Sequence, residues 1–309
     1  MQIDQLGIHD SVSAVFPPEQ LREALSDQPP AVVVVGDDRE EIAACDAIVT
    51  FAYEEAFLEL DWIHSIQAGY DRFPLEELEK REIVLTNSTG IHGTSVGETV
   101  VGYMLMLARR LGQYARQQER KQWKRPEWNV PFTLADESVC VVGLGTLGRG
   151  VAERANAIGM EVTGVRRSET PVEGVDRVYA NEDLHEAISQ ATFVVLAVPL
   201  TENTEELLGE AEFEAMDEES YIINVSRGAV LDQNALVSAL EAGEIRGAAL
   251  DVFESEPLPE QSPLWGMDDV IVTPHAAAYT REYYEEIATL VRKNVERIEK
   301  GESFENRVV

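Results

Sequence analysis

The chain has 309 residues, of which 44% are hydrophobic, so it can build a core for each of two ordinary domains and is not expected to be disordered. It carries 57 Asp and Glu residues against 25 Lys and Arg residues, a formal net charge of -32. Such a surface repels phosphate, which argues against nucleic acid and anionic membranes as partners, and an anionic ligand must therefore enter a local basic pocket.

The acidic residues are spread along the whole chain, and lysine is scarce. A face that binds a basic partner would concentrate its carboxylates in one block, which is not seen. Self-repulsion of this size destabilises a compact state until salt screens it, while hydrated carboxylates keep the surface soluble. We predict a salt-requiring protein from a halophile.

The first half of the chain alternates short β-branched runs with helical patterns. The runs are AVVVVG at 31–36, AIVTF at 47–51 and WIHSI at 62–66. A long helical pattern without proline follows at 95–121 and is predicted to connect two domains, and the aromatic and proline-rich residues 122–131 are predicted to be irregular.

The second half repeats the alternation. Its apolar runs are VCVVG at 139–143, VTGV at 162–165, FVVLAV at 193–198, YIINV at 221–225, AALDVF at 248–253 and VIVTP at 270–274. Alternation of this kind predicts βαβ units, and hence two doubly wound parallel-sheet domains. A last helical pattern at 280–300 returns the chain to the first domain, so we predict a discontinuous domain of residues 1–100 and 277–309 and a second domain of residues 101–276.

Cys45 and Cys140 lie far apart, each within an apolar run, so they are read as buried hydrophobic residues. Neither a disulfide nor a metal site is supported, because no two histidines have a ligand-like spacing. The amino-terminal residues do not resemble a signal peptide, and no run has the length of a membrane span. We therefore expect a soluble cytoplasmic protein.

The chain carries a G-x-G-x-x-G spacing at Gly143, Gly145 and Gly148. Alone this spacing is weak evidence, but here an apolar strand precedes it, and a helical pattern and a second strand follow. Gly143 makes the turn, Gly145 lets a pyrophosphate approach the backbone, and Gly148 permits close helix packing. The free N–H groups at the helix start then hold the anion.

The residue that ends the second strand of such a unit meets the adenosine ribose, and an acid there accepts hydrogen bonds from NAD. This chain has Arg166, followed by Arg167 and Ser168. Two guanidinium groups and a hydroxyl suit a 2′-phosphate, which favours NADP(H) over NAD(H). The alternative is that both arginines neutralise nearby surface carboxylates.

Three ionisable residues each follow a later strand, namely Arg227, Glu256 and His275. The carboxyl ends of parallel strands share one edge, so all three are predicted to converge on the cofactor crevice. Arginine suits a carboxylate, histidine exchanges protons near neutral pH, and a carboxylate orients the imidazole. Singly, each could be structural. The other histidines, His9, His64, His92 and His185, lack such company and are read as packing or surface residues.

With these residues in place, the chain resembles the D-isomer-specific 2-hydroxyacid dehydrogenases, the family of D-glycerate, hydroxypyruvate and glyoxylate reductases. The matching stretches occur in family order and are VVGLGTLGRGVA, AVPLTENTEELLG, INVSRGAVLDQNAL, GAALDVFESEPLP and VIVTPHAAAYT. Weaker matches, SIQAGYDRFP and TNSTGIHGTSVGETVVGYMLMLAR, extend the resemblance over nearly the full length.

The resemblance implies a Rossmann domain, a flavodoxin-like substrate domain and a homodimer. It implies that Arg227 and the N–H groups of Ala68 and Gly69 bind the substrate carboxylate, that His275 is the general acid, and that Glu256 is its partner. The cofactor contacts it implies are Thr146, Leu147, Val198, Pro199, Thr204, Val225, Asp251, His275 and Ala277. Two positions depart from the family: Arg166 replaces the acid of NAD-dependent members, and Tyr70-Asp71-Arg72 stands where Val-Asp-Asn is more common.

These observations together predict NADP(H)-preferring reduction of 2-oxo acids to D-2-hydroxy acids, with NAD(H) also possible. A dinucleotide-sensing, corepressor-like binding protein without useful turnover is the alternative from another class. A relative acting on formate or phosphite is the enzyme alternative. The sequence leaves the particular oxo acid open.

Overall fold

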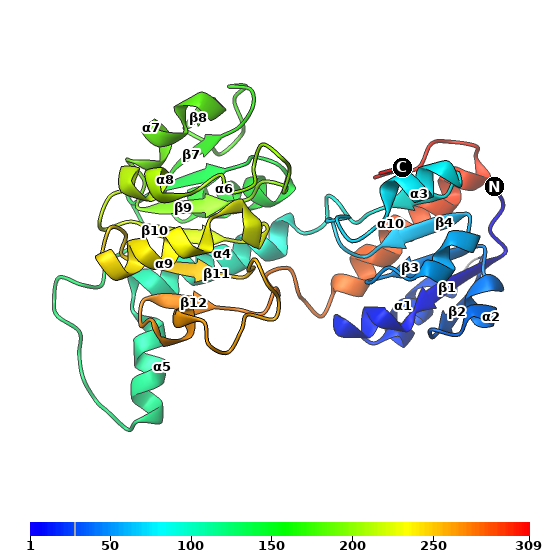
Figure 1. The fold of residues 1–309 in the computed structure, drawn as a ribbon, viewed down its shortest axis with the longest axis horizontal. Helices are drawn as coiled ribbons and strands as arrows, with labels where there is room; N and C mark the ends of the chain where they lie inside the picture. Colours follow the sequence, from blue (N-terminus) through cyan, green and yellow to red (C-terminus); the bar gives the residue numbers. More distant parts are fainter. Residues whose placement is uncertain (28) are drawn as a thin grey trace. The chain divides into compact units, whose positions relative to one another are not determined.

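The computed structural model describes residues 1–27 and 29–309, which divide into two compact units (Figure 1). Unit 1 consists of residues 1–91 and 279–309, and unit 2 consists of residues 92–278. The first segment of unit 1 ends at Ile91, before the predicted boundary at residue 100. The assignment of substrate and cofactor roles to these units stays a prediction.

Unit 1 is built on a five-stranded parallel sheet in the order β2-β1-β3-β4-β5. This is the strand order of the flavodoxin-like, doubly wound fold. The strands are β1 (Gln5–His9), β2 (Ala31–Val35), β3 (Ala47–Thr50), β4 (Trp62–Ser65) and β5 (Val84–Thr86), and the helices are α1 (Pro18–Leu25), α2 (Arg39–Ala43), α3 (Leu75–Lys80) and α10 (Tyr283–Glu299).

Two apolar layers cover the faces of this sheet because successive strand residues point to opposite sides. Leu6, Ile8 and Val49 face the layer that includes residues of α1 and α10, whereas Ile48 and Ile63 face the layer with α2 and α3. Near-continuous apolar strands are what a sheet covered on both faces requires.

Unit 2 contains a seven-stranded parallel sheet in the order β12-β11-β10-β9-β6-β7-β8. The order reverses between β6 and β9, which is the switch point of a Rossmann fold. The strands are β6 (Ser138–Val142), β7 (Glu161–Val165), β8 (Arg177–Tyr179), β9 (Phe193–Leu196), β10 (Tyr221–Asn224), β11 (Gly247–Leu250) and β12 (Val270–Val272). The helices are α4 (Gly93–Ala108), α5 (Leu111–Glu119), α6 (Thr146–Ala157), α7 (Leu184–Ile188), α8 (Glu210–Ala215) and α9 (Gln233–Ala242).

Helices α4 and α6 pack backbone to backbone on one face of this sheet. A Cβ on Gly97 would lie 2.3 Å from the carbonyl oxygen of Gly150, and a Cβ on Gly150 would lie 1.9 Å from that of Gly93. The glycines therefore set how closely the two helices approach. This contact fixes the start of α6, where the dinucleotide loop is predicted.

The predicted helix over 95–121 is in fact two helices, so this prediction was wrong. Helix α4 ends at Ala108 and α5 begins at Leu111, because Arg110 takes a left-handed conformation with φ of +56°. The redirected chain places Arg110 in an ion pair with Asp269 and puts Arg116 3.3 Å from Asp268. These pairs tie α5 to the residues before β12.

The predicted fold class is confirmed, with two parallel α/β sheets of the expected kinds. Both cysteines are buried and unpaired, and burial raises the pKa of the Cys140 thiol to about 12, as expected for an inert packing residue. Among the described residues, no helix combines the length and the apolar character that crossing a bilayer requires.

Candidate active site

The three predicted loop glycines follow β6, and they are required for different reasons. Gly143 has φ of +99°, and a Cβ there would lie 2.7 Å from the Ala197 carbonyl oxygen. A Cβ on Gly148 would lie 1.8 Å from the Gly143 carbonyl oxygen. At Gly145, by contrast, no atom of the described residues other than Gly145 and its two chain neighbours lies within 4 Å of a built Cβ. Packing thus demands glycine at two positions, whereas Gly145 borders open space of the kind a pyrophosphate would enter.

The start of α6 is the natural anion site of this loop. No side chain among the described residues caps the helix, so the N–H groups of its first turn, including those of Thr146 and Leu147, lack a capping partner. The helix dipole adds positive potential at the same point. These features fit a dinucleotide pyrophosphate.

Arg166 follows β7 directly, and its N–H donates to the Tyr179 carbonyl oxygen at 3.1 Å. Its side chain is half-buried, while Arg167 and Ser168 are exposed. No carboxylate of the described residues lies within ion-pair distance of either guanidinium group, although 57 acidic residues are present in the chain. This finding does not favour the interpretation of the two arginines as local charge neutralisers.

Arg227 is held by a turn that sequence reasoning did not identify. Asn224 ends β10 inside the core, and its Oδ1 accepts hydrogen bonds from the Ser226 N–H and hydroxyl, while its Nδ2 donates to the Arg227 carbonyl oxygen at 3.0 Å. The backbone at Gly228 packs against the chain at Phe253, where a Cβ would lie 1.9 Å from the carbonyl carbon. The sequence feature that could have indicated this turn is Asn224, the one polar amide in the otherwise apolar run YIINV.

Glu256 and His275 form the predicted pair. His275 Nδ1 lies 2.9 Å from Glu256 Oε2, and Glu256 Oε1 accepts from the Phe253 N–H at 3.2 Å. The two side chains are 30% and 32% exposed, so both can be reached from solvent. A carboxylate at Nδ1 fixes the tautomer and leaves Nε2 as the ring atom that exchanges a proton with a ligand.

Asp251 anchors the turn that presents His275. Its buried carboxylate accepts hydrogen bonds from the Thr273 hydroxyl at 2.7 Å and from the N–H groups of Ala276 and Ala277, both at 2.9 Å. His275 has φ of +52°, a conformation that costs a non-glycine residue about 1–3 kcal/mol. The anchor therefore offsets the strain at His275, and the nicotinamide contact predicted for Asp251 stays a prediction.

Tyr103 on α4 supports the same anchor and was missed by sequence reasoning. Its hydroxyl lies 2.6 Å from the Thr273 hydroxyl and 3.5 Å from Asp251 Oδ1. Burial and the nearby carboxylate raise the pKa of Tyr103, which keeps the phenol protonated as a donor. Nothing in the sequence pattern connects a helix residue with a strand end so far along the chain.

The remaining predicted cofactor residues line the same edge of the sheet. Val198 lies beside the glycine loop, since its Cγ1 would be 2.7 Å from a Cβ on Gly143. Thr204 donates its hydroxyl proton to the Pro199 carbonyl oxygen at 2.6 Å and closes the turn after β9. Val225 and Ala277 are buried where they follow β10 and β12.

Within unit 2, then, the glycine loop, Arg166, Arg227, Glu256 and His275 all follow the carboxyl ends of parallel strands, as predicted. Ala68 and Gly69 belong to unit 1, where they follow β4, the strand that lies between β3 and β5. Their segment is half-buried.

The other histidines take packing or surface positions. His64 and His92 are buried, and burial lowers their pKa values to about 3 and about 4. His185 is exposed and lies 2.8 Å from Glu212. Buried His9 has its Nε2 3.2 Å from Asp37, and with Asp10 these residues bring three possible ligand atoms within 4.8 Å of one another. Both carboxylates are largely exposed, so the contact is that of an imidazole with surface acids.

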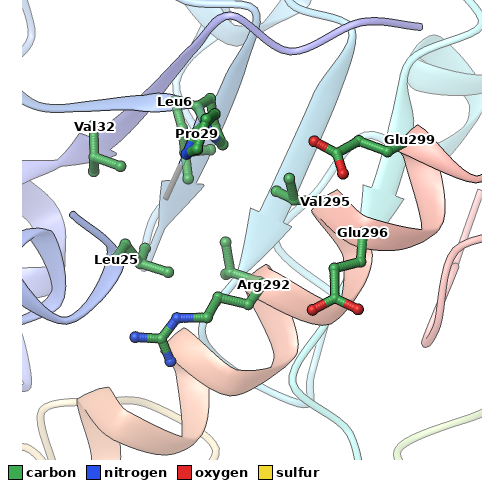
Figure 2. A pocket seen from close by; sticks show the side chains of 10 residues that line it. Leu6, Leu25, Pro29, Val32, Arg292, Val295, Glu296 and Glu299 are labelled. Atoms are coloured by element: carbon green, nitrogen blue, oxygen red, sulfur yellow. The ribbon is translucent and has the colours of Figure 1, made fainter. Parts of the chain in front are cut away.

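A separate pocket of about 200 Å³ lies in unit 1 near the start of β1 and β2, against α10 (Figure 2). Leu6, Leu25 and Val32 give it apolar walls, and the Arg292 guanidinium donates to the Ala24 carbonyl oxygen. It contains none of the predicted site residues. Its place at the amino ends of the strands is opposite to the edge where α/β folds bind ligands.

Comparison with known proteins agrees with this geometry. A family model described as D-isomer specific 2-hydroxyacid dehydrogenase, NAD binding domain, matches residues 101–277. A glyoxylate reductase of Korarchaeum cryptofilum is 32% identical over 283 residues, covering 87% of this chain and 84% of that protein.

Two solved structures are similar over nearly the whole chain. A D-isomer specific 2-hydroxyacid dehydrogenase family protein from Aeromonas salmonicida has a TM-score of 0.84 and 28% identity, covering 100% of this chain and 99% of that one. A D-isomer specific 2-hydroxyacid dehydrogenase from Xanthobacter autotrophicus, solved with NADPH and MES, has a TM-score of 0.79 and 28% identity, covering 99% and 98%. The chain therefore belongs to the D-isomer-specific 2-hydroxyacid dehydrogenase family.

Proposed function

We propose that the protein is an NADP(H)-preferring oxidoreductase that reduces small 2-oxo acids to D-2-hydroxy acids. The observation that carries this proposal is the Glu256–His275 pair at the sheet edge that also bears the glycine loop. The relatives named glyoxylate reductase and glyoxylate/hydroxypyruvate reductase support small 2-oxo acids as the substrate class.

His275 acts as general acid in reduction and as general base in the reverse direction. Its Nε2 gives a proton to the oxygen of the substrate ketone, while Glu256 holds the Nδ1–H and stabilises the charged ring. Arg227 binds the substrate carboxylate, and the Asn224 turn limits its movement. A bound nicotinamide would supply or accept the hydride.

The preference for NADP(H) rests on Arg166, Arg167 and Ser168. Two guanidinium groups without carboxylate partners among the described residues, at the end of the strand that meets the ribose, suit a 2′-phosphate. That a relative of 28% identity was solved with NADPH is in keeping with this preference.

We also propose a cytoplasmic homodimer whose interface includes α5 and the segment after it, which project from unit 2 (Figure 1). Trp123 and Trp128 are 96% and 93% exposed. Exposed large apolar side chains that lie close together mark protein interaction surfaces. The basic residues among residues 111–128 are Arg116, Arg120, Lys121, Lys124 and Arg125, against the two acids Glu119 and Glu127. A second copy of the chain offers a complementary acidic surface. Light scattering of the Trp123→Ser variant tests this dimer interface. A variant that remains dimeric would contradict it.

The test of the activity compares kcat/KM for NADPH and NADH with glyoxylate and hydroxypyruvate in molar KCl. We expect a clear NADPH preference in the wild type and its loss in Arg166→Asp. His275→Ala should lower kcat by about 10²–10⁴-fold. His185→Ala is the matched control, since it removes a histidine paired with a glutamate at 2.8 Å outside the site.

Each outcome separates a different part of the proposal. Activity with NADH alone would remove the role of Arg166 and keep the reaction, and an undiminished His275→Ala enzyme would overturn its acid–base role. If neither coenzyme supports reduction and the protein binds a protein partner in a coenzyme-dependent way, the corepressor-like alternative would be favoured over an enzyme.

A further inference from the structure

The segment that follows β4 has every backbone carbonyl from Ser65 to Ala68 engaged by a donor within unit 1. The Ser88 hydroxyl donates to the Ser65 oxygen at 2.9 Å, and the Ser88 N–H donates to the Gln67 oxygen at 3.0 Å. The Tyr283 hydroxyl donates to the Ile66 oxygen, and Asn87 Nδ2 donates to the Ala68 oxygen at 2.6 Å. Four consecutive carbonyls are thus fixed by the two residues that follow β5 and by α10.

A buried chain of hydrogen bonds fixes the direction of the Ser88 contact. Trp62 Nε1 donates to the Thr86 hydroxyl, so that hydroxyl can give its proton to His64 Nδ1 at 2.8 Å. His64 Nε2–H then donates to the Ser88 hydroxyl at 3.2 Å, and Ser88 donates onward to the Ser65 oxygen. Every donor in this chain is satisfied when His64 is neutral.

The neutral state of His64 is secured by its complete burial. Burial lowers the pKa of His64 to about 3, so the ring remains uncharged at any working pH. The chain is therefore a fixed support and not a titrating group. It ends at the Ser65 carbonyl oxygen, at the start of the segment 65–68.

The N–H groups of the same segment show the opposite pattern. The Gln67 N–H donates to the Ser65 hydroxyl at 3.3 Å, but within the described part of the chain no acceptor is found for the N–H groups of Ala68 and Gly69. Fixing the carbonyls determines the orientation of the peptide planes, because each plane carries both groups. The two open donors are thereby held ready for an anionic ligand.

We infer that Asn87, Ser88 and Tyr283 are positioning residues that hold the Ala68 and Gly69 N–H groups for the substrate carboxylate. This inference rests on the proposed function and deepens it, since it explains how unit 1 contributes fixed donors. Asn87 is the most direct of the three, because its amide holds the peptide whose nitrogen belongs to Gly69.

The test uses the full chain, with oxamate as a probe that has the carboxylate and carbonyl of a 2-oxo acid but is not reduced. Asn87→Ala should raise the KM for glyoxylate and the Kd for oxamate by about 10-fold, with the KM for NADPH unchanged. Tyr283→Phe removes one hydroxyl, keeps the ring that packs against Phe16, and should act in the same direction. Gln5→Ala is the matched control, because its Nε2 donates at 3.2 Å to the Ala44 oxygen, outside the segment.

The inference is overturned if Asn87→Ala and Tyr283→Phe both keep the oxamate Kd of the Gln5→Ala control. Should Asn87→Ala fail to fold, Tyr283→Phe alone decides the question. Oxamate binding is measured by calorimetry and does not depend on turnover. A wild type that binds oxamate without reducing glyoxylate would contradict the proposed function, while the variants would still test the positioning residues.

Discussion

Replacing Asp251 by asparagine tests whether the turn at His275 depends on a buried carboxylate. Aspartate presents two acceptor oxygens, and here they receive three close donors, namely the Thr273 hydroxyl and the N–H groups of Ala276 and Ala277. An asparagine amide has one acceptor oxygen and places an NH₂ group where the second oxygen was. In either orientation the NH₂ group faces at least one backbone N–H.

The expected loss of stability follows from counting these contacts. One buried N–H left without an acceptor costs about 1–3 kcal/mol, and the remaining bonds lose the assistance of the charge, about 1 kcal/mol more. We expect a total of about 3 kcal/mol, which for a unit the size of residues 92–278 lowers Tm by about 6–12 °C. Because His275 is part of this turn, its imidazole should be displaced in the variant, and kcat should fall about 10–100-fold.

Thermal unfolding followed by circular dichroism, in salt at which the wild type is folded, measures the first effect, and steady-state kinetics measure the second. Asp268→Asn is the control, because Asp268 is 88% exposed and lies outside the turn. A Tm equal to that of the control would refute the anchoring role of Asp251. A rise in the KM for NADPH with unchanged Tm would instead support the nicotinamide contact that the family resemblance implies.

Three further predictions concern other parts of the chain. Gly145→Ala should fold with a normal Tm and bind NADPH at least about 10-fold more weakly. Gly148→Ala should lower Tm, because a Cβ at residue 148, unlike one at residue 145, would meet a backbone atom. Equal Tm values for the two variants would contradict this. Because the pKa of His64 is depressed in the folded protein, protonation of this histidine favours the unfolded state below about pH 6.5. Between pH 7 and pH 5 the free energy of unfolding should therefore fall by about 2 kcal/mol more in the wild type than in His64→Gln. Chemical denaturation at the two pH values measures this difference. Dialysis into dilute buffer should unfold the protein, and a native circular dichroism spectrum there would refute the salt requirement.

The architecture was accessible from the sequence because parallel strands covered on both faces must be apolar throughout. The runs that became β6, β7, β9 and β10 are of this kind, and they fixed the order of elements. The break between α4 and α5 was not accessible, since Arg109 and Arg110 are good helix formers and proline is absent. The ion pairs of Arg110 with Asp269 and of Arg116 with Asp268 override local propensity, and such partners cannot be read from a local pattern.

The candidate site was predictable to the extent that it lies where strands end. Position after a strand was enough to pair Glu256 with His275, because neighbouring strand ends share an edge. The supports behind those residues were not predictable, as the example of Tyr103 shows. Asn87 and Tyr283 likewise come from distant parts of the chain, and each donates to a carbonyl of the residues that follow β4.

The composition of the chain itself makes Arg166 and Arg167 informative. With 57 acidic residues and 25 basic ones, carboxylate partners are plentiful, and several arginines are paired with one, as Arg39 is with Glu59 and Arg177 is with Glu186. Two adjacent arginines that form no such pair among the described residues, at the end of β7, are therefore less expected here than in a neutral protein. In concentrated salt the general field is screened beyond about 3 Å, so such arginines can bind an anion only by direct contact. A ligand phosphate that accepts hydrogen bonds from both is the partner that these conditions favour.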